Sequence, residues 1–444
     1  MNGSSNYNIK FMCIVWTTIL SLFYLLPAPT FAEELMSYSY LLLTGWAFVE
    51  SKRIHKDPVN ILSIYLFLLL YFNGMNIVWD ILGILDMDDP DWFSGLSISS
   101  EDNARALFNM NLSIIAVVLG NSICPRAIDK SVTVEEIHIP DFVLYILLFV
   151  GMSVKAFFSI KGFYLTQTLG YHESFAEGGG FPWYANVLSL LALFVLLIKI
   201  KECKKVWYVL LLVYIALSMA TGQRSKGLLV LFIFIYILYS YRIMELNATK
   251  VIALGVVFLL ISIGVATARN GNEFISEISQ VVEFVEGAPY KVLQKSVQFR
   301  EYIDYNFIDM FGNIKSTFSD IKGEKLTARA LEFKVWNGYI SYICNSTMYL
   351  AGWGMGGNFI GQLFAVGREF AVIIGSIFVG YFLNVINSGL FSNNCIKRFF
   401  FFNLAFTFLY ISRDHLFCFL TTMISPITAI CIVLLFRPYF YYKK

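Results

Sequence analysis

Long apolar runs alternate with short polar segments along the whole chain. Runs of about 20 apolar residues are typical of helices that cross a lipid bilayer. A transmembrane β-barrel would instead alternate apolar and polar residues in short segments, which these runs do not do. The chain is therefore expected to be all-α, a polytopic transmembrane helical bundle of about twelve spans. The predicted spans are 11–31, 34–50, 59–80, 104–122, 140–160, 183–200, 206–221, 227–241, 250–268, 369–391, 397–412 and 414–436.

The loops between these spans alternate in charge, and this alternation predicts the side on which each lies. Lysine and arginine gather in the loops at 52–56, 199–205 and 397–398, whereas the loop at 86–102 is rich in aspartate and glutamate. Short loops rich in lysine and arginine normally stay in the cytoplasm. Both termini are therefore expected to be cytoplasmic, and the segment 269–368 is expected on the outer side.

The first span admits two interpretations. Ala28, Thr30 and Ala32 resemble a signal-peptidase site that follows an apolar stretch. However, Lys10 is the only charge before the apolar run, and the run is long for a signal peptide, so a retained helix is favoured. Either choice leaves the orientation of the later spans unchanged.

The predicted organisation is a single integral membrane domain over residues 1–444 that contains one large external loop, 269–368. The first part of this loop, 274–299, has the periodicity of an amphipathic helix at the membrane surface. A later part, 352–360, is rich in glycine and apolar residues. Such backbone can re-enter a membrane only where protein or a water-filled cavity lines it.

Composition supports the membrane class and excludes several functions. Hydrophobic residues make up 57% of the 444 residues and charged residues 14%, against about a quarter charged residues in soluble domains. The seven cysteines are scattered without a CxxC pair, and the four histidines lack zinc spacing. Walker A and GxGxxG motifs are absent. No metal, cofactor or nucleic-acid partner is therefore expected.

Arginines placed at the outer ends of predicted helices are the main functional signal. A guanidinium group is planar, permanently charged and bidentate toward phosphate, so a cluster of them suits a diphosphate. An arginine at a helix end also often extends only to lipid headgroups, and Arg413 has a neighbouring ion-pair partner in Asp414. The candidate diphosphate-binding residues are Arg224, Arg269, Arg368 and Arg413, with Gln223 adding a donor beside Arg224.

The chain resembles the Wzy-type O-antigen polymerases of the bacterial inner membrane. The likeness rests on its length, its span plan and the large external loop in its C-terminal half. It rests also on residues 221–225 (Thr-Gly-Gln-Arg-Ser) and on the glycine-rich run 354–361, which leads into 364–375. Where family members often carry an acidic residue just after the glycine-rich run, this chain has Gln362, which leaves the identity of a catalytic base open.

The resemblance implies a glycosyltransferase of the GT-C type that uses lipid-linked sugars and needs no cofactor. Donor and acceptor would be oligosaccharide repeat units on undecaprenyl diphosphate, and a chain-length regulator is a further expected partner. A base beside the acceptor hydroxyl would assist its attack. The candidate bases are external residues next to arginines, in the order Glu369, His415, Asp414.

Two other functions remain open from the sequence, besides a scaffold role that would leave the outer arginines unexplained. A flippase for lipid-linked oligosaccharides would need about the same number of spans and cationic groups for the diphosphate. It would be expected to show internal repeats and charges within the spans, whereas no repeat is visible and the arginines lie at outer helix ends. An O-antigen ligase would share both the large external loop and the arginines.

Overall fold

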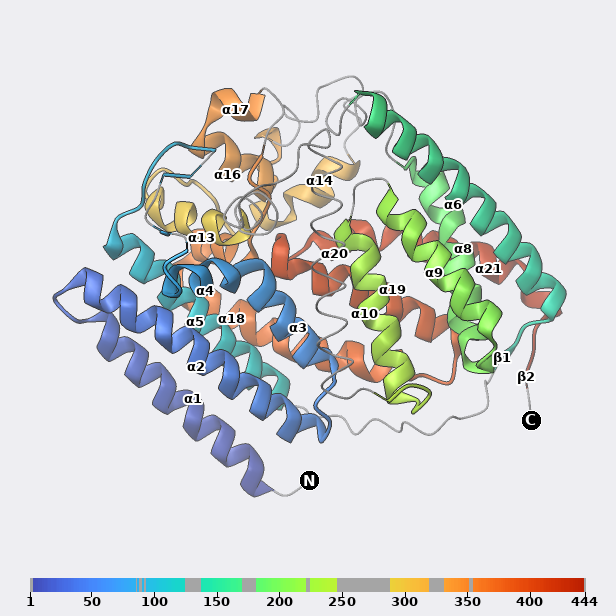
Figure 1. Ribbon diagram of the computed structural model, residues 1–444, viewed down its shortest axis with the longest axis horizontal. Coiled ribbons are helices and arrows are strands. Elements are labelled where there is room, and N and C mark those ends of the chain that lie inside the picture. Colours follow the sequence, from blue (N-terminus) through green and yellow to red (C-terminus); the bar gives the residue numbers. More distant parts are fainter. Residues whose placement is uncertain are drawn as a thin grey trace. The chain divides into compact units, whose positions relative to one another are not determined.

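The described part of the chain folds almost entirely into helices, which confirms the predicted all-α membrane architecture (Figure 1). A computed structural model describes residues 3–84, 86–87, 90–91, 93–123, 137–169, 181–220, 224–245, 288–318, 331–350 and 354–442. Within these residues, seven helices are long and apolar enough to cross a membrane, and three apolar helices are shorter. The seven are Ile61–Ile81, Ser100–Ile123, Asp141–Thr166, Trp183–Glu202, Phe359–Leu390, Cys395–Arg413 and Cys418–Leu435.

The chain divides into two compact units, each built from separate stretches of sequence. The first comprises Met1–Ala127, Ile278–Val385 and Phe408–Thr421. The second comprises Ile128–Glu277, Ile386–Thr407 and Thr422–Lys444. The expectation of one membrane domain over residues 1–444 stays a prediction.

The first unit holds most of the candidate site residues that the structure describes. Its elements are α1 (Gly3–Tyr24), α2 (Pro29–His55), α3 (Ile61–Leu69), the π-helical turn η1 (Leu70–Gly74), α4 (Met75–Ile81), α5 (Ser100–Ile123), α13 (Ala288–Gln298), η3 (Asp309–Phe311), α14 (Gly312–Phe318), α16 (Trp336–Cys344), α17 (Ser346–Leu350), most of α18 (Phe359–Leu390), η4 (Tyr410–Arg413) and most of α20 (Cys418–Thr422).

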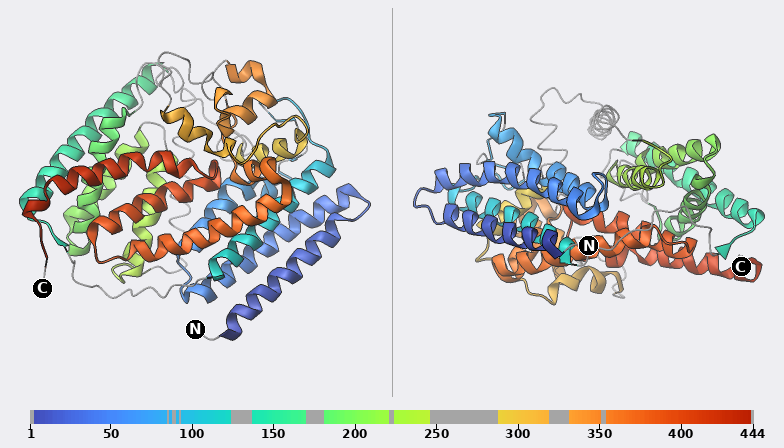
Figure 2. Two further views of the ribbon diagram at one scale, coloured as in Figure 1. Left: turned by 180° about the vertical axis from the view of Figure 1, so that it is seen from behind. Right: turned by 90° about the horizontal axis from the view of Figure 1, so that it is seen from below.

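Helix α5 is the centre of this unit, and it packs against α1, α2 and α18 (Figures 1 and 2). Buried polar side chains join these helices: the Asn111 amide donates to the Met36 carbonyl at 3.0 Å, and that of Asn121 donates to the Gly380 carbonyl at 3.0 Å. Small and polar residues let membrane helices approach closely. At Gly380, an added Cβ would lie 2.0 Å from the carbonyl oxygen of Val117.

Because this approach leaves no room for a methyl group, Gly380→Ala is expected to destabilise the protein by about 1–3 kcal/mol. Gly45→Ala is the matched control, since Gly45 also lies inside a helix but an added Cβ there would have no neighbour within 4 Å. Thermal unfolding of both purified variants should show a lower midpoint for Gly380→Ala alone. Equal midpoints would contradict the described packing of α5 against α18.

The second unit is also helical, apart from one short strand pair. Its elements are β1 (Ile137–His138), α6 (Asp141–Leu169), α8 (Trp183–Lys199), η2 (Ile200–Glu202), α9 (Lys205–Ala220), α10 (Arg224–Ser240), most of α19 (Cys395–Leu409), α21 (Ile424–Leu435), η5 (Arg437–Tyr439) and β2 (Tyr441–Tyr442). Helix α8 packs against α6, α9 and α21, and β1 pairs antiparallel with β2. Aromatic contacts join α8 and α10 to α19, with the Phe234 and Phe402 ring centroids 4.8 Å apart.

Four predicted elements differ from the structure, are not tested by it or lie outside its described part. Helix α18 is interrupted by non-helical backbone at Gly367 and Arg368, and the part after this break matches the predicted span 369–391, whereas the helical segment that begins at Phe359 was not predicted. Helix α2 carries charges near both ends and is in neither apolar set, so its crossing stays a prediction. The predicted span 250–268 and most of the amphipathic helix 274–299 lie outside the described residues. The described end of that helix, α13, is buried within the first unit instead of lying on its surface.

Candidate active site

Three guanidinium groups gather where the start of α5 meets the first part of α18. Arg105 donates through Nε to Glu369 Oε1 at 2.8 Å. Arg300 pairs with Asp102, one turn before Arg105 on α5. Arg368 donates to the main-chain carbonyl of Arg300 at 3.1 Å. These side chains form the arginine cluster: Arg105, Arg300 and Arg368 with Asp102 and Glu369.

The phenyl ring of Phe364 makes cation–π contacts with two of these guanidinium groups. The Cζ atoms of Arg105 and Arg368 lie 5.2 Å and 5.1 Å from the centroid of the Phe364 ring. Such placement gives a cation–π attraction of about 0.5–2 kcal/mol each, which offsets part of the repulsion between the like charges. Among the described residues, Arg368 has no carboxylate within ion-pair distance, in contrast to Arg105 and Arg300.

The backbone at Arg368 is strained. Its φ of 54° and ψ of −149° interrupt α18 immediately after Gly367. That combination is close to a region populated almost only by glycine, and holding another residue there costs on the order of 1–3 kcal/mol. Glycine would adopt this conformation without the strain that arginine meets here.

Local sequence explains how the two helices that carry the cluster begin. The Ser99 hydroxyl accepts from the Asp102 amide at 3.1 Å and so caps α5, whose acidic first turn suits the positive end of the helix dipole. The Asn358 side chain accepts from the Gly361 amide at 2.9 Å and caps α18. The Asn358 amide also donates to Asn73 in the π-helical turn at 2.6 Å. Single π-helical turns occur frequently at functional sites.

A second group of polar residues surrounds an aspartate–histidine pair after η4. Asp414 Oδ1 lies 2.6 Å from His415 Nδ1, and it accepts from Asn337 Nδ2 at 2.7 Å. Burial opposes ionisation of Asp414, but the charge and hydrogen bonds of His415 and the amide of Asn337 bring the pKa of that carboxyl below its usual value. In the neutral form of the ring, a proton on Nδ1 facing Asp414 would leave the lone pair on Nε2.

His415 Nε2 is buried, and it has no hydrogen-bond partner in the described part of the chain. An unpaired buried acceptor costs roughly 1–3 kcal/mol, so it calls for an explanation. Gln362 fixes the adjacent backbone, accepting from the Leu416 amide at 2.9 Å and donating to the Tyr305 hydroxyl at 2.9 Å. The residue that stands where an acid was expected therefore positions the loop beside His415.

The glycine-rich run fits against the same pair. A Cβ at Gly357 would lie 2.4 Å from Asn337 Oδ1 and 2.9 Å from Asp414 Oδ1, so only glycine allows this approach. Gly356 has a φ of 86°, which glycine adopts without strain, and a Cβ added there would have no neighbour within 4 Å. The run thus brings backbone close to the carboxylate while leaving open space beside Gly356.

The structure brings together some of the predicted site residues and not others. Arg368 and Glu369 meet in the arginine cluster, Asp414 and His415 form the pair, and the Arg413 guanidinium lies 5.4 Å from the Phe72 ring centroid. Arg224 begins α10 in the second unit, but its side chain is outside the described part of the chain. Gln223 and Arg269 also lie outside the described residues.

Sequence reasoning missed Arg105, Arg300 and Asn337. Arg105 had a recognisable signal, because it is an arginine inside the predicted span 104–122 and close to its outer end. Arg300 and Asn337 had none, since neither stands in a pattern within the large loop. Among the described residues, no three His, Cys, Asp or Glu side chains are grouped so as to hold a metal ion.

A family model described as O-antigen polysaccharide polymerase Wzy matches residues 9–444, nearly the whole chain. The chain belongs to this family. No curated protein and no solved structure matches it. As a Wzy family member it is a multi-pass membrane protein and an O-antigen polymerase, which confirms the resemblance and favours polymerase over flippase and ligase.

Proposed function

We propose that this polymerase transfers the growing chain from undecaprenyl diphosphate to a new lipid-linked repeat unit, at the periplasmic face of the bacterial inner membrane. Arg368 carries the proposal. It is a cation without a carboxylate partner among the described residues, and it is held in a backbone conformation that disfavours arginine. Both features suit a residue kept to receive an anion.

The arginine cluster would bind the diphosphate of the donor. When the bond between the sugar and the diphosphate breaks, the leaving oxygen gains negative charge. Guanidinium groups fixed in advance stabilise that charge without reorganising, an effect of about 2.7–4 kcal/mol for one well-placed donor. Glu369 and Asp102 would hold Arg105 and Arg300 in place, leaving Arg368 as the group with an open charge.

His415 would act as the base, with Asp414 orienting its ring. The acceptor hydroxyl oxygen forms the new bond to the anomeric carbon, its proton passes to His415 Nε2, and the lipid diphosphate departs with the bonding electrons. Glu369, the first candidate from the sequence, is engaged by Arg105 at 2.8 Å and is less available for a proton. The acceptor would reach Nε2 past the glycine-rich run, where side chains are few.

The sidedness of the site can be tested directly. Reporter fusions at residues 52, 203 and 397 are expected to be cytoplasmic, and fusions at 90, 175, 224 and 320 periplasmic, because of the charge pattern of the loops. Cytoplasmic signals from 320 would put the arginine cluster on the wrong side for a periplasmic substrate. That outcome would remove the proposed function while leaving the family assignment intact.

Arg224, with Gln223, Arg269 and Arg413, remains a proposed contributor to diphosphate binding. Cells that carry Arg224→Ala are expected to make single repeat units and no polymer, since one guanidinium group is lost from the substrate. Arg224→Lys should restore little, because an ammonium group cannot form two parallel hydrogen bonds. A normal ladder of chain lengths from Arg224→Ala, at equal protein level in the membrane, would reduce Arg224 to a headgroup anchor.

A further inference from the structure

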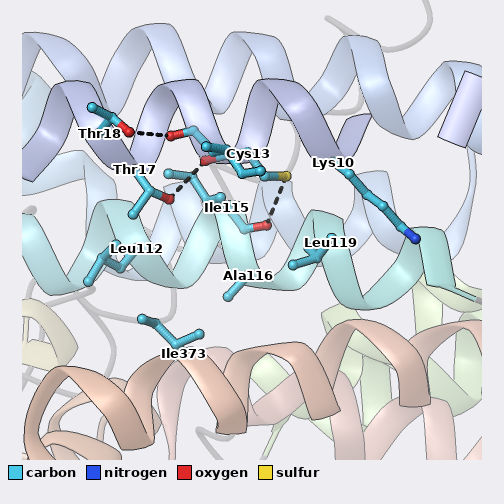
Figure 3. Close-up of a pocket in the computed structure, with 10 residues that line it drawn as sticks. Lys10, Cys13, Thr17, Thr18, Leu112, Ile115, Ala116, Leu119 and Ile373 are labelled. Atoms are coloured by element: carbon cyan, nitrogen blue, oxygen red, sulfur yellow. Dashed lines mark hydrogen bonds between the residues drawn. The ribbon is translucent and has the colours of Figure 1, made fainter. Parts of the chain in front are cut away.

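A groove in the first unit lies between three helices, two of which also carry members of the arginine cluster. It has a volume of about 260 Å³ and is lined by α1, α5 and α18. Figure 3 shows side chains of α1 and α5 facing one another across it, with Ile373 of α18 on the third side. Its lining is apolar apart from Lys10 and a few hydroxyl and thiol groups of α1.

Those hydroxyl and thiol groups are already engaged. Thr17 and Thr18 donate to the main-chain carbonyls one turn earlier, at 2.8 Å and 2.9 Å, and the Cys13 thiol points to the Ile115 carbonyl at 4.0 Å. The groove therefore presents methyl and methylene groups to an occupant and offers it few hydrogen bonds. Such a lining selects for a hydrocarbon chain.

The residues of α5 and α18 that line the groove lie on the same sides of these helices as Arg105 and Glu369 of the arginine cluster. Residues seven apart lie on nearly the same side of a helix, and Leu112 and Leu119 are seven and fourteen residues after Arg105 on α5. Ile373 lies one turn after Glu369 on α18. From Arg105 to Leu119 the helix rises roughly 21 Å.

The residues of α1 that line the groove show the same seven-residue spacing, counted back from Tyr24. Thr17 and Lys10 lie seven and fourteen residues before Tyr24. The Tyr24 ring stacks on that of Phe108 with centroids 4.9 Å apart, and Phe108 is one turn from Arg105. All three walls thus run from the level of the arginine cluster, along the helices, toward Lys10.

We infer that the groove binds the polyprenyl chain of the lipid-linked substrate while the arginine cluster holds its diphosphate. This inference rests on the proposed function, and it adds a lipid-chain site that selects for chain length. Charge determines the choice of occupant. A substrate whose anionic diphosphate is bound at Arg105 and Arg368 would have its polyprenyl chain beside the groove-lining residues of α1, α5 and α18. A cavity of this size holds only a segment of a long chain, and the rest would lie in the bilayer.

Polymerisation kinetics with two synthetic substrates test the inference. They carry the same repeat unit and diphosphate, one on a long polyprenyl chain and one on a short prenyl chain. Filling the groove with Ile373→Trp in the full-length purified protein is expected to raise KM for the long-chain substrate about tenfold without lowering kcat, since the lost binding is common to the ground state and the transition state. KM for the short-chain substrate should stay within about twofold, which also reports correct folding.

The neighbouring Ile374→Trp is the matched control, because Ile374 is 52% exposed and does not line the groove. It should leave both KM values unchanged. Equal effects of Ile373→Trp on both substrates, or none on either, would overturn the lipid-chain site. If the unaltered protein joins neither substrate, the proposed function fails instead, so the two failures are distinguishable.

A second measurement identifies the occupant without relying on activity. A photoreactive residue at position 373 is expected to crosslink to the long polyprenyl substrate in phospholipid nanodiscs, whereas one at 374 should capture mainly phospholipid. Equal capture of phospholipid at both positions would show an ordinary lipid-facing surface and would contradict the inference.

Discussion

Replacing His415 by alanine is expected to lower kcat by roughly 10²–10⁴-fold, because the acceptor hydroxyl would lose the base that takes its proton. KM should change little, since the arginine cluster and the sugar contacts remain. The measurement is the initial rate of polymer formation by purified protein over a range of substrate concentrations. Asp414→Asn should cause a loss of similar kind, because an amide would no longer require the proton to sit on Nδ1.

Two matched variants separate a chemical role from a structural one. His55 is another partly buried histidine of the first unit, hydrogen-bonded to Asn121 Oδ1 at 2.8 Å, and His55→Ala should affect stability while leaving kcat near its normal value. Glu369→Gln tests the competing base. If Glu369 only holds Arg105, its amide variant should lose no more than about tenfold in rate. A complete loss in Glu369→Gln with an active His415→Ala would reverse the assignment.

Arg368→Ala is expected to lower kcat/KM by roughly 10²–10³-fold, the effect of removing one fixed donor from a developing anion. Arg368→Lys should restore little of this, because the planar fork of donors is lost. Arg53→Ala is the control: Arg53 pairs with Glu50, whose side chain is only 3% exposed, so the variant should lose stability while keeping its kcat/KM. Steady-state kinetics on equal amounts of folded protein measure both effects.

The strained backbone allows a sharper version of this test. Arg368→Gly removes the side chain and also relieves the strain at a φ of 54°, so the variant should be at least as stable as the unaltered protein and yet as inactive as Arg368→Ala. Thermal unfolding and kinetics on the same preparation compare the two quantities. Activity retained in Arg368→Gly would show that the guanidinium group does not meet the diphosphate.

Much of the helical framework follows from hydropathy alone. The predicted spans 59–80, 104–122 and 183–200 correspond to helices 61–81, 100–123 and 183–199. The predicted spans agree well with these helices because a helix that crosses a bilayer needs a long uninterrupted apolar run, and such a run can be recognised directly in the sequence. The predicted span 369–391 corresponds to the part of α18 that follows the non-helical residues Gly367 and Arg368. The helical segment before them, buried through Phe359, Ile360 and Phe364, was not predicted, because Arg368 and Glu369 interrupt the apolar run.

Only part of the candidate site could be predicted from the sequence. Arginines at the helix ends that are predicted to face outward, and the residues after η4, stand out by type and position, so Arg368, Asp414 and His415 could be named. The partners of these residues could not, since Glu369 and Arg105 are 264 positions apart and nothing local links them. The function of Gln362 likewise depends on Tyr305 and Leu416, which meet only in the folded chain.

The most direct measurement gives the purified protein, reconstituted in liposomes, undecaprenyl-diphosphate-linked repeat units and no nucleotide sugar. We expect a ladder of lengthened products and one undecaprenyl diphosphate released for each linkage formed, with both lost in Arg368→Ala and His415→Ala. Units that cross the liposome membrane but are never joined, or products that form only when a nucleotide sugar is added, would contradict this expectation.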